Sequence, residues 1–376
     1  MTTPTTAPPF APAKVYELST AFWQTKLIMT ASELGVFARL ADGPATRAEL
    51  GEGLGLKPPA LHDFLDALVA LGLLERRDGG RYANTAESDF YLVPGKRYYM
   101  GHYLTFVDNF MRPTWDGLAE MLRTGKPPAP QGPPPGPPAP NGAGPDAGQS
   151  AGQGARNGAE AVQKEGSEFF EHTYANVDLQ RMFMEAQDSL SSEIAWEISR
   201  RVDWSQWRTL VDLGGARGNT AGILLEAHPH LTATVFDMPP IEPLFHEHME
   251  RLGVAGRARY QGGDWFENPL PEGDVLLCGH ALHNWTTDQR RTVIAKAYDA
   301  VLPGGAFLVH DLMIDAGRER LNPLMLSLAM TLSVGGSGYT AEECTGWLAE
   351  AGFEDVEAIP LQDHDGHTVV LGRKPR

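Results

Sequence analysis

The sequence has few cysteines, no long apolar run and fewer basic than acidic residues. Its 376 residues include only Cys278 and Cys344, far apart in the chain, which excludes a disulfide framework and a thiolate metal site. No apolar run approaches the roughly 20 residues that cross a bilayer, so we expect no membrane partner. The 31 Lys and Arg residues against 48 Asp and Glu residues give a formal net charge of −17, which disfavours nucleic-acid binding because phosphate contacts need basic side chains. A cytoplasmic protein that binds a small neutral or cationic molecule fits these limits.

The composition divides the chain into four segments. Residues 1–12 are rich in Thr and Pro and lack the basic start and apolar core of a signal peptide, so we expect a disordered tail. Residues 13–97 have helical periodicity and end in a hairpin pattern. Residues 98–203 are also helical, interrupted at residues 127–158 by a Pro- and Gly-rich insertion that cannot bury a core and should be disordered. Residues 204–376 alternate between strand and helix patterns and should form a separate domain.

The segment at residues 13–97 predicts a winged-helix domain. Thr46 and Glu49 have the spacing of a capping box at the start of a short helix, and a hairpin follows a strong amphipathic helix. A winged helix suggests DNA binding, and a ligand-sensing regulator is therefore one alternative function. However, the helix at residues 59–71, which would read DNA, contains acidic residues and no Lys or Arg. We therefore expect this domain to serve dimerisation or substrate enclosure.

The segment at residues 204–376 predicts an α/β domain with a mainly parallel sheet covered on both faces. Ligands of such sheets bind beyond the carboxyl ends of the strands, so the informative residues should follow the strands. The predicted strands lie at residues 210–213, 232–236, 258–261, 274–278, 306–309, 353–358 and 368–372.

The first of these strands leads into a glycine-rich turn. Gly214, Gly215 and Gly218 allow a ligand to approach the main chain closely, and the helix that follows offers free N–H groups. The spacing differs from the G-x-G-x-x-G of dinucleotide sites. Asp212, just before the turn, would repel a pyrophosphate but attract a cationic methionine end. These features favour S-adenosylmethionine, although a purely structural role for Asp212 is an alternative.

Two further acids follow the next strands. Asp237 lies about 20 residues beyond the glycine turn, where a carboxylate accepts hydrogen bonds from both ribose hydroxyls of a nucleoside. Asp264 is followed by Trp265 and Phe266, which together offer a carboxylate for an adenine amino group and apolar surface for its ring. The three acids therefore outline a nucleoside site along the sheet edge.

Histidines follow the fourth and fifth strands. His280 and His283 are three residues apart and suggest a metal pair, but no third ligand stands at convincing spacing, so we expect no metal. A histidine beyond a strand end is better interpreted as a general base. Asp311 is placed to accept from its other ring nitrogen, while His310 should face the opposite side of the strand. The remaining histidine clusters are expected to be solvated surface: His246 with His248, and His364 with His367.

Taken together, the motifs resemble those of the S-adenosylmethionine-dependent O-methyltransferases of the caffeate and hydroxyindole type, particularly bacterial members that act on aromatic natural products. Residues 211–218 are similar to the family's V-D-V-G-G-G-x-G, and residues 236–239 to F-D-L-P. Residues 263–266 are similar to G-D-x-F, and residues 282–285 to L-H-D-W. The resemblance implies a Rossmann-like methyltransferase domain with a seven-stranded sheet, preceded by a winged-helix domain through which the family forms homodimers.

The resemblance also implies site residues. His283 would be the general base and Asp311 its orienting partner. The cofactor would be bound by Asp212, Gly214, Gly215, Gly218, Asp237, Met238, Asp264, Trp265, Phe266 and Gly279. The pocket for an aromatic substrate would be lined by Tyr103, Phe106, Phe183, Gln187, Met330 and Ser333, although core packing is the commoner role of any single apolar residue.

Some positions depart from the family's pattern. Ala216 replaces the third glycine, which should be tolerated if its φ is negative. Asn284 replaces the acid after the base, and Gly279 replaces a basic residue that contacts the cofactor. Asp311 replaces a Glu, and its shorter side chain is not expected to reach the histidine easily. The predicted function is methyl transfer to a hydroxyl of an aromatic or polyketide-like molecule; the alternative is a relative that binds the same cofactor for hydroxylation, decarboxylation or cyclisation.

Overall fold

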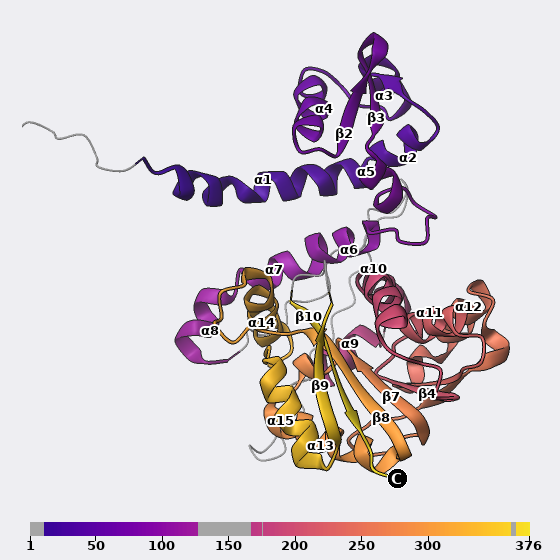
Figure 1. Ribbon diagram of the computed structural model, residues 1–376. Helices are drawn as coiled ribbons and strands as arrows, with labels where there is room; N and C mark the ends of the chain where they lie inside the picture. Colours follow the sequence, from indigo (N-terminus) through magenta and orange to yellow (C-terminus); the bar gives the residue numbers. More distant parts are fainter. Residues whose placement is uncertain (1–10, 127–166, 175, 362–365) are drawn as a thin grey trace, which may run out of the picture. The chain divides into compact units, whose positions relative to one another are not determined.

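The computed structural model describes residues 11–126, 167–174, 176–361 and 366–376 (Figure 1). The predicted insertion at residues 127–158 and most of the predicted tail lie outside these ranges. The chain separates into two compact units, one ending at Thr105 and one beginning at Phe106, and each is described by itself. The finer division into four segments stays a prediction.

The first unit is helical with a small sheet. Three strands form the sheet in the order β1-β3-β2, and β2 and β3 form the predicted hairpin. The predicted capping box is present, because the Thr46 side chain accepts from the Glu49 amide and Glu49 bonds back to the Thr46 amide. The elements are α1 (Ala13–Glu33), α2 (Val36–Ala41), β1 (Ala45–Thr46), α3 (Arg47–Gly53), α4 (Ala60–Ala70), β2 (Leu74–Arg77), η1 (Asp78–Gly80), β3 (Arg81–Asn84), α5 (Ala86–Tyr91) and α6 (Gly101–Phe106).

The second unit begins with helices that precede its sheet. Both helical stretches that the periodicity predicts are present, and the Asn176 side chain caps the longest helix by accepting from two backbone amides. The elements are η2 (Val107–Met111), which is a π-helical segment, α7 (Arg112–Trp115), α8 (Leu118–Thr124), α9 (Ser167–Tyr174) and α10 (Val177–Arg201).

A seven-stranded sheet in the order β6-β5-β4-β7-β8-β10-β9 forms the centre of the second unit. All neighbouring strands are parallel except β10, which is antiparallel to both of its neighbours. This is the Rossmann-like methyltransferase sheet that the sequence predicts. The strands are β4 (Thr209–Leu213), β5 (Thr232–Asp237), β6 (Ala258–Gly262), β7 (Gly273–Gly279), β8 (Val301–Leu312), β9 (Glu354–Pro360) and β10 (His367–Arg373).

Alternate residues of the strands pack into two separate cores, one on each face. Leu276 and Phe307 belong to the core that includes α13 and α15, whereas Leu277 and Leu308 belong to the core that includes α10, α11 and α12. Figure 1 shows these two groups of helices on opposite faces of the sheet. The helices are α11 (Asn219–Ala227), η3 (Pro239–Ile241), α12 (Glu242–Arg251), η4 (Ala255–Arg257), η5 (Leu282–Asn284), α13 (Thr287–Ala300), α14 (Leu321–Ser333) and α15 (Ala341–Ala351).

The strand order places the predicted functional residues along one edge. β4 lies between β5 and β7, so the chain reverses its winding direction there, which is where open α/β sheets bind ligands. The turns that follow β4, β5, β6 and β7 therefore meet at one edge of the sheet. Within the part of the chain that the structure describes, no helix is both long enough and apolar enough to cross a membrane.

An ion pair between the buried Arg217 and the partly buried Asp188 connects the glycine turn to α10. Arg217, in the turn, donates from Nε and Nη2 to Asp188 Oδ2 at 2.9 and 2.7 Å. Burial raises the pKa of Asp188 to about 6, although Arg217 opposes the shift. Asn219, at the start of α11, donates to the hydroxyls of Ser191 and Ser192 at 2.9 Å each. The turn is thus held from α10 as well as from the sheet.

Replacing Arg217 with Met should destabilise the protein, because the largely buried Asp188 loses its hydrogen-bonded cation and keeps only Arg251, at 3.7 Å. We expect a loss of about 3 kcal/mol in the free energy of unfolding, measured by urea denaturation at pH 7.5. Arg200→Met is the matched control, since the Arg200 side chain is 72% exposed where it pairs with Glu197, and it should cost under about 1 kcal/mol. Equal losses for the two variants would contradict a structural role for the pair.

Candidate active site

His283 and Asp311 form a short, buried polar contact at the sheet edge. His283 lies in η5, after β7, and Asp311 lies near the end of β8. His283 Nδ1 is 2.6 Å from Asp311 Oδ1, and both side chains are buried. A carboxylate accepts the Nδ1 proton, so Nε2 is left with the lone pair that a general base needs. The expectation that the aspartate arm is too short is therefore wrong.

Asp311 has further donors that keep it ionised. The Tyr339 hydroxyl donates to its Oδ2 at 2.8 Å, and the Leu312 amide donates to its Oδ1 at 2.9 Å. Burial raises the pKa of Asp311, but the charge and hydrogen bond of His283 outweigh it and hold the pKa well below its usual range. Residues 335–343 also resemble a family motif, but no role was predicted for Tyr339, and its contact with Asp311 had no sequence signal.

Arg290 holds the η5 loop that carries His283. Its guanidinium donates to the Leu282 carbonyl at 2.9 Å and to the Ser337 carbonyl, and it lies over the Tyr339 ring at 4.7 Å. The Ser337 amide donates to the His283 carbonyl at 2.9 Å. Arg290 is 1% exposed, so this arrangement is internal to the protein. Arg290 is a positioning residue that the sequence analysis missed.

Asp212 lies beneath the glycine turn. It is 2% exposed, and its Oδ2 has no hydrogen-bond partner in the part of the chain that the structure describes. A β-carbon at Gly215 would lie 2.6 Å from Asp212 Cγ and 2.9 Å from Val235 Cγ1, so only glycine fits there. Burial raises the pKa of Asp212 to about 7, with a further contribution from the charge of Asp237, while the Ala221 amide opposes the shift. An unpaired buried oxygen at this position is suited to a cationic ligand.

Asp237 caps the same turn from β5. Its Oδ2 accepts from the Ala216 amide at 2.8 Å and its Oδ1 from the Met238 amide at 2.7 Å. Burial raises its pKa to about 6, and these two amides oppose the shift. Ala216 has a φ of +51°, so the condition under which an alanine was expected to be tolerated here, a negative φ, is not met. The left-handed conformation aims the Ala216 amide at Asp237, at a cost of about 1–2 kcal/mol for a residue with a β-carbon.

The turn after β6 carries the predicted adenine residues. Asp264 Oδ1 accepts from the Phe266 amide at 2.8 Å, and Asp264 is partly buried. Trp265 is 9% exposed, and its ring lies 3.1 Å from a β-carbon built on Gly214, which has a φ of +66°. Gly279 ends β7 and pairs with β8. The predicted cofactor residues thus lie at the strand ends and in the turns along one edge of the sheet.

An aromatic cluster lies beside the glycine turn. Phe106 and Phe183, both predicted substrate residues, are in edge contact with ring centroids 5.7 Å apart. Phe170 contacts Phe183 and also stacks with Trp285 at 6.3 Å, and Trp285 follows His283 by two residues. A continuous aromatic surface therefore extends from α10 to the loop that carries the base.

The other predicted substrate residues are less closely connected. Met330 and Ser333 lie on α14, which contacts η5, but the Ser333 hydroxyl bonds the Ala329 carbonyl of its own helix at 2.7 Å. Gln187 is partly buried on α10. Tyr103 belongs to the first unit. The roles of these four residues stay predictions.

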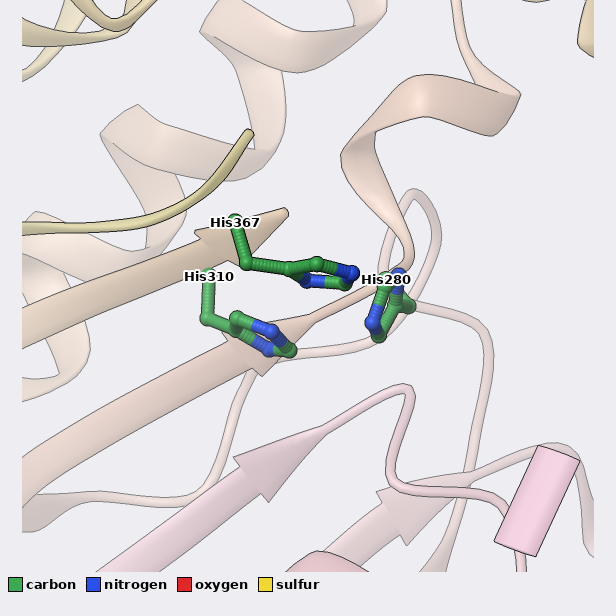
Figure 2. Close-up of side chains that lie close together, drawn as sticks. All are labelled: His280, His310 and His367. Carbon is green, nitrogen blue, oxygen red and sulfur yellow. The ribbon is translucent and has the colours of Figure 1, made fainter. Parts of the chain in front are cut away.

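Two histidines expected on the solvated surface are buried or clustered. His248 is 2% exposed, and its Nε2 lies 3.2 Å from Asn219 Oδ1. His367 lies beside His280 and His310, with ring centroids 5.1 and 5.7 Å away (Figure 2). The surface prediction is wrong for both, because α12 turns His248 toward Asn219 of α11 and the pairing of β10 with β8 brings His367 beside His310. His364 lies outside the described residues.

Comparison with known proteins identifies the family. A family model described as O-methyltransferase domain matches residues 154–354, and one described as O-methyltransferase dimerisation domain matches residues 16–94. The tetracenomycin polyketide synthesis 8-O-methyl transferase of Streptomyces glaucescens is 39% identical over 97% of both chains. An N,N-dimethyltransferase of Streptomyces rimosus is 36% identical over 100% of both chains.

A solved structure with the same fold contains the predicted cofactor. Human N-acetylserotonin methyltransferase in complex with S-adenosylmethionine superposes with a TM-score of 0.80, covering 99% of this chain and 100% of that one at 24% identity. The family models span both units of the chain, and the sequence relatives match it along nearly its whole length. The chain therefore belongs to the O-methyltransferase family and is an S-adenosylmethionine-dependent methyltransferase.

Proposed function

We propose that this enzyme methylates a phenolic hydroxyl of a polycyclic aromatic molecule of polyketide type, with His283 as the general base. The observation that carries the proposal is the 2.6 Å contact between His283 Nδ1 and the buried Asp311 carboxylate. A phenol with a pKa of about 10 is mostly protonated at neutral pH and gains from a positioned base. Asp311 is the positioning residue that fixes the His283 tautomer and stabilises the imidazolium after proton removal.

The residues at the sheet edge fit the cofactor. Asp212, with its unpaired buried Oδ2, would bind the cationic methionine end, and Asp237 would accept from the ribose hydroxyls with its remaining lone pairs. Asp264 and Phe266 would contact the adenine. When bound, S-adenosylmethionine supplies an electrophilic methyl group on a positively charged sulfur. The protein's contribution is to align the acceptor oxygen with that methyl group and to remove its proton.

The acceptor class rests on the aromatic cluster and on the relatives. Phe106, Phe170 and Phe183 present flat apolar surface that continues to Trp285 near the base. The Streptomyces glaucescens relative is named as an O-methyltransferase of polyketide synthesis. The Streptomyces rimosus relative is named as an N,N-dimethyltransferase, so an amine acceptor is the second candidate. The buried base favours the hydroxyl, because a neutral amine needs no proton removal before it attacks.

We also propose that the chain forms a homodimer through α1. This helix exposes large apolar side chains, Phe22 at 65% and Trp23 at 60% among them. Such a row of apolar residues along a helix indicates an interaction surface. The match to the dimerisation domain includes residues 16–33 of this helix.

His283→Ala should lower the rate of methyl transfer to a polycyclic phenol by about 10²–10⁴-fold at pH 7, because proton removal loses its base. The loss should shrink as the pH approaches 9.5, since the phenol then ionises without help. S-adenosylhomocysteine formation and the mass of the product measure the rate. Tyr339→Phe is the control, because it removes one donor of Asp311 but not the base, and it should lose under about tenfold.

Three outcomes would contradict this assignment. If the rate of methyl transfer by His283→Ala is lowered by the same factor at all pH values, His283 has a structural role. Turnover of matched aromatic amines but not phenols would favour the second candidate. Conversion of substrate without S-adenosylhomocysteine would favour a non-methylating relative.

The affinity for S-adenosylmethionine should rise with pH and level off above about pH 7. Cofactor binding favours the ionised form of Asp212, whose pKa burial raises to about 7, so below that pH binding must displace a proton. Calorimetric titration from pH 5.5 to 8 should show up to a tenfold gain per pH unit between about pH 6 and 7, where Asp212 alone titrates, and a steeper gain below about pH 6, where Asp237 titrates as well. The Asp212→Asn variant should bind S-adenosylmethionine more weakly. Its affinity should keep only the pH dependence that comes from Asp237, whose pKa is about 6. Asp203→Asn, at an exposed acid, should keep the wild-type profile, and an unchanged profile in Asp212→Asn would contradict the role of Asp212.

Phe22→Asp should shift the protein toward a monomer, because a charge in an apolar interface must be desolvated. Sedimentation at micromolar concentration measures the change. Asp63→Ala, at an exposed acid on α4, should leave the oligomeric state as in the wild type. A Phe22→Asp protein that sediments as a dimer would show that α1 is not the interface.

A further inference from the structure

We propose that His280, His310 and His367 form a binding site for a late first-row transition-metal ion, of which Zn²⁺ is the best match. One ligand nitrogen from each residue lies within 4.8 Å of the others. The sequence spacing showed only one pair of histidines and no third ligand. The fold supplies the further ligands from β8 and β10, which are distant in sequence from His280.

The three side chains converge because of the sheet register. His310 on β8 is paired with Val369 on β10, so His367, two residues along, is its diagonal neighbour on the same face. His280 follows β7, and its amide donates to the His310 carbonyl at 2.9 Å. Its φ of +50° is unusual for a residue with a β-carbon, and its ring reaches a centroid distance of 4.5 Å from His310. Figure 2 shows the three rings gathered around a common space.

Two of the ring nitrogens have no partner among the residues that the structure describes. His280 Nε2 and His310 Nε2 are both buried and form no hydrogen bond with any described residue. Buried polar atoms are normally paired, so an unsatisfied pair in one place calls for a bound ion or water. Gly279 leaves room for this arrangement, since a β-carbon there would lie 3.1 Å from His310 Nδ1.

The surroundings of His280 resemble those of a metal-binding imidazole. Its Nδ1 lies 3.7 Å from Asp311 Oδ1, and metal-bound histidines commonly present their second nitrogen to a carboxylate. Burial lowers the pKa of His280 to about 4 and that of His310 well below its usual value. Both rings are therefore neutral at pH 7, which is the form that binds metals.

The ligand chemistry selects the ion. Three imidazoles suit Zn²⁺, Cu²⁺ or Ni²⁺, whereas Mg²⁺ and Ca²⁺ prefer oxygen ligands. A tetrahedral Zn²⁺ with bonds of about 2.0–2.1 Å holds its nitrogens roughly 3.3 Å apart, so the rings must rotate inward on binding. The three histidines leave one position on the ion for water.

Metal binding should also slow methyl transfer, a consequence that rests on the proposed function. Asp311 Oδ1 lies 2.6 Å from His283 Nδ1 and 3.7 Å from His280 Nδ1. A cation on Nε2 of His280 makes its Nδ1 proton a stronger donor, which draws Asp311 away from His283. The site would therefore couple metal occupancy to the orientation of the base.

The test is a Zn²⁺ titration of the tag-free full-length protein by calorimetry, with metal analysis after dialysis. We expect one bound ion per chain for the wild type and no binding of Mg²⁺. His310→Ala and His367→Gln should each weaken Zn²⁺ binding by at least about tenfold. His246→Ala is the matched control, because its side chain is 61% exposed on α12, and it should bind as the wild type does. Thermal melting confirms that each variant is folded, and visible absorption of bound Co²⁺ reports tetrahedral nitrogen ligands.

Several outcomes would overturn the site. The site would be excluded if the wild type does not bind Zn²⁺ stoichiometrically. It would also be excluded if a folded His367→Gln variant binds Zn²⁺ as tightly as the wild type. His283→Gln should retain binding; if it alone abolishes binding, the ion lies instead between His280, His283 and Asp311. Slower methyl transfer with Zn²⁺ in the wild type but not in His367→Gln supports the coupling, and an unchanged rate with bound Zn²⁺ overturns it. The binding measurements need no substrate, so failure of the proposed function would not be confused with failure of the metal site.

Discussion

The hydrogen bond between His283 and Asp311 is the interaction on which the rest of the site depends. A buried carboxylate is costly unless donors surround it, and Asp311 has His283, Tyr339 and its neighbouring amide. Its short side chain reaches the histidine of η5, a segment that Arg290 holds in place by donating to the Leu282 and Ser337 carbonyls. The family resemblance implied a Glu at this position, so the loop and not the length of the acid sets the distance.

The acids along the sheet edge differ in state because their donors differ. Asp311 is fully bonded, and its pKa lies well below the usual range. Within the described ranges, Asp212 has an oxygen without a donor and Asp237 accepts from backbone amides, so burial raises their pKa values to about 7 and about 6. A cation beside Asp212 would stabilise its ionised carboxylate, as His283 and Tyr339 stabilise the carboxylate of Asp311. The same edge thus combines a completed acid–base pair with acids suited to an added positive charge.

Much of the fold could be predicted from sequence because its signals are local. The hydrophobic runs located all seven strands of the large sheet, and Thr46 with Glu49 predicted a capping box that is present. The glycine turn and the acids after β4, β5 and β6 also follow from strand ends alone. The residues that support Asp311 and His283 could not be predicted in this way. Tyr339 contacts Asp311, and Arg290 contacts the loop that carries His283, through the packing of segments that are distant in sequence.

Ala216 and His367 show why other details were missed. Ala216 has a positive φ in a turn where its amide donates to Asp237 of β5, and no residue pattern records this contact between the turn and the neighbouring strand. His367 has polar neighbours in sequence, yet antiparallel pairing of β10 with β8 brings it beside His310. Because side chains alternate along β8, His310 and Asp311 leave the strand on opposite faces. His280, after β7, lies within reach of both, so its imidazole is the physical link between the histidine cluster and the base.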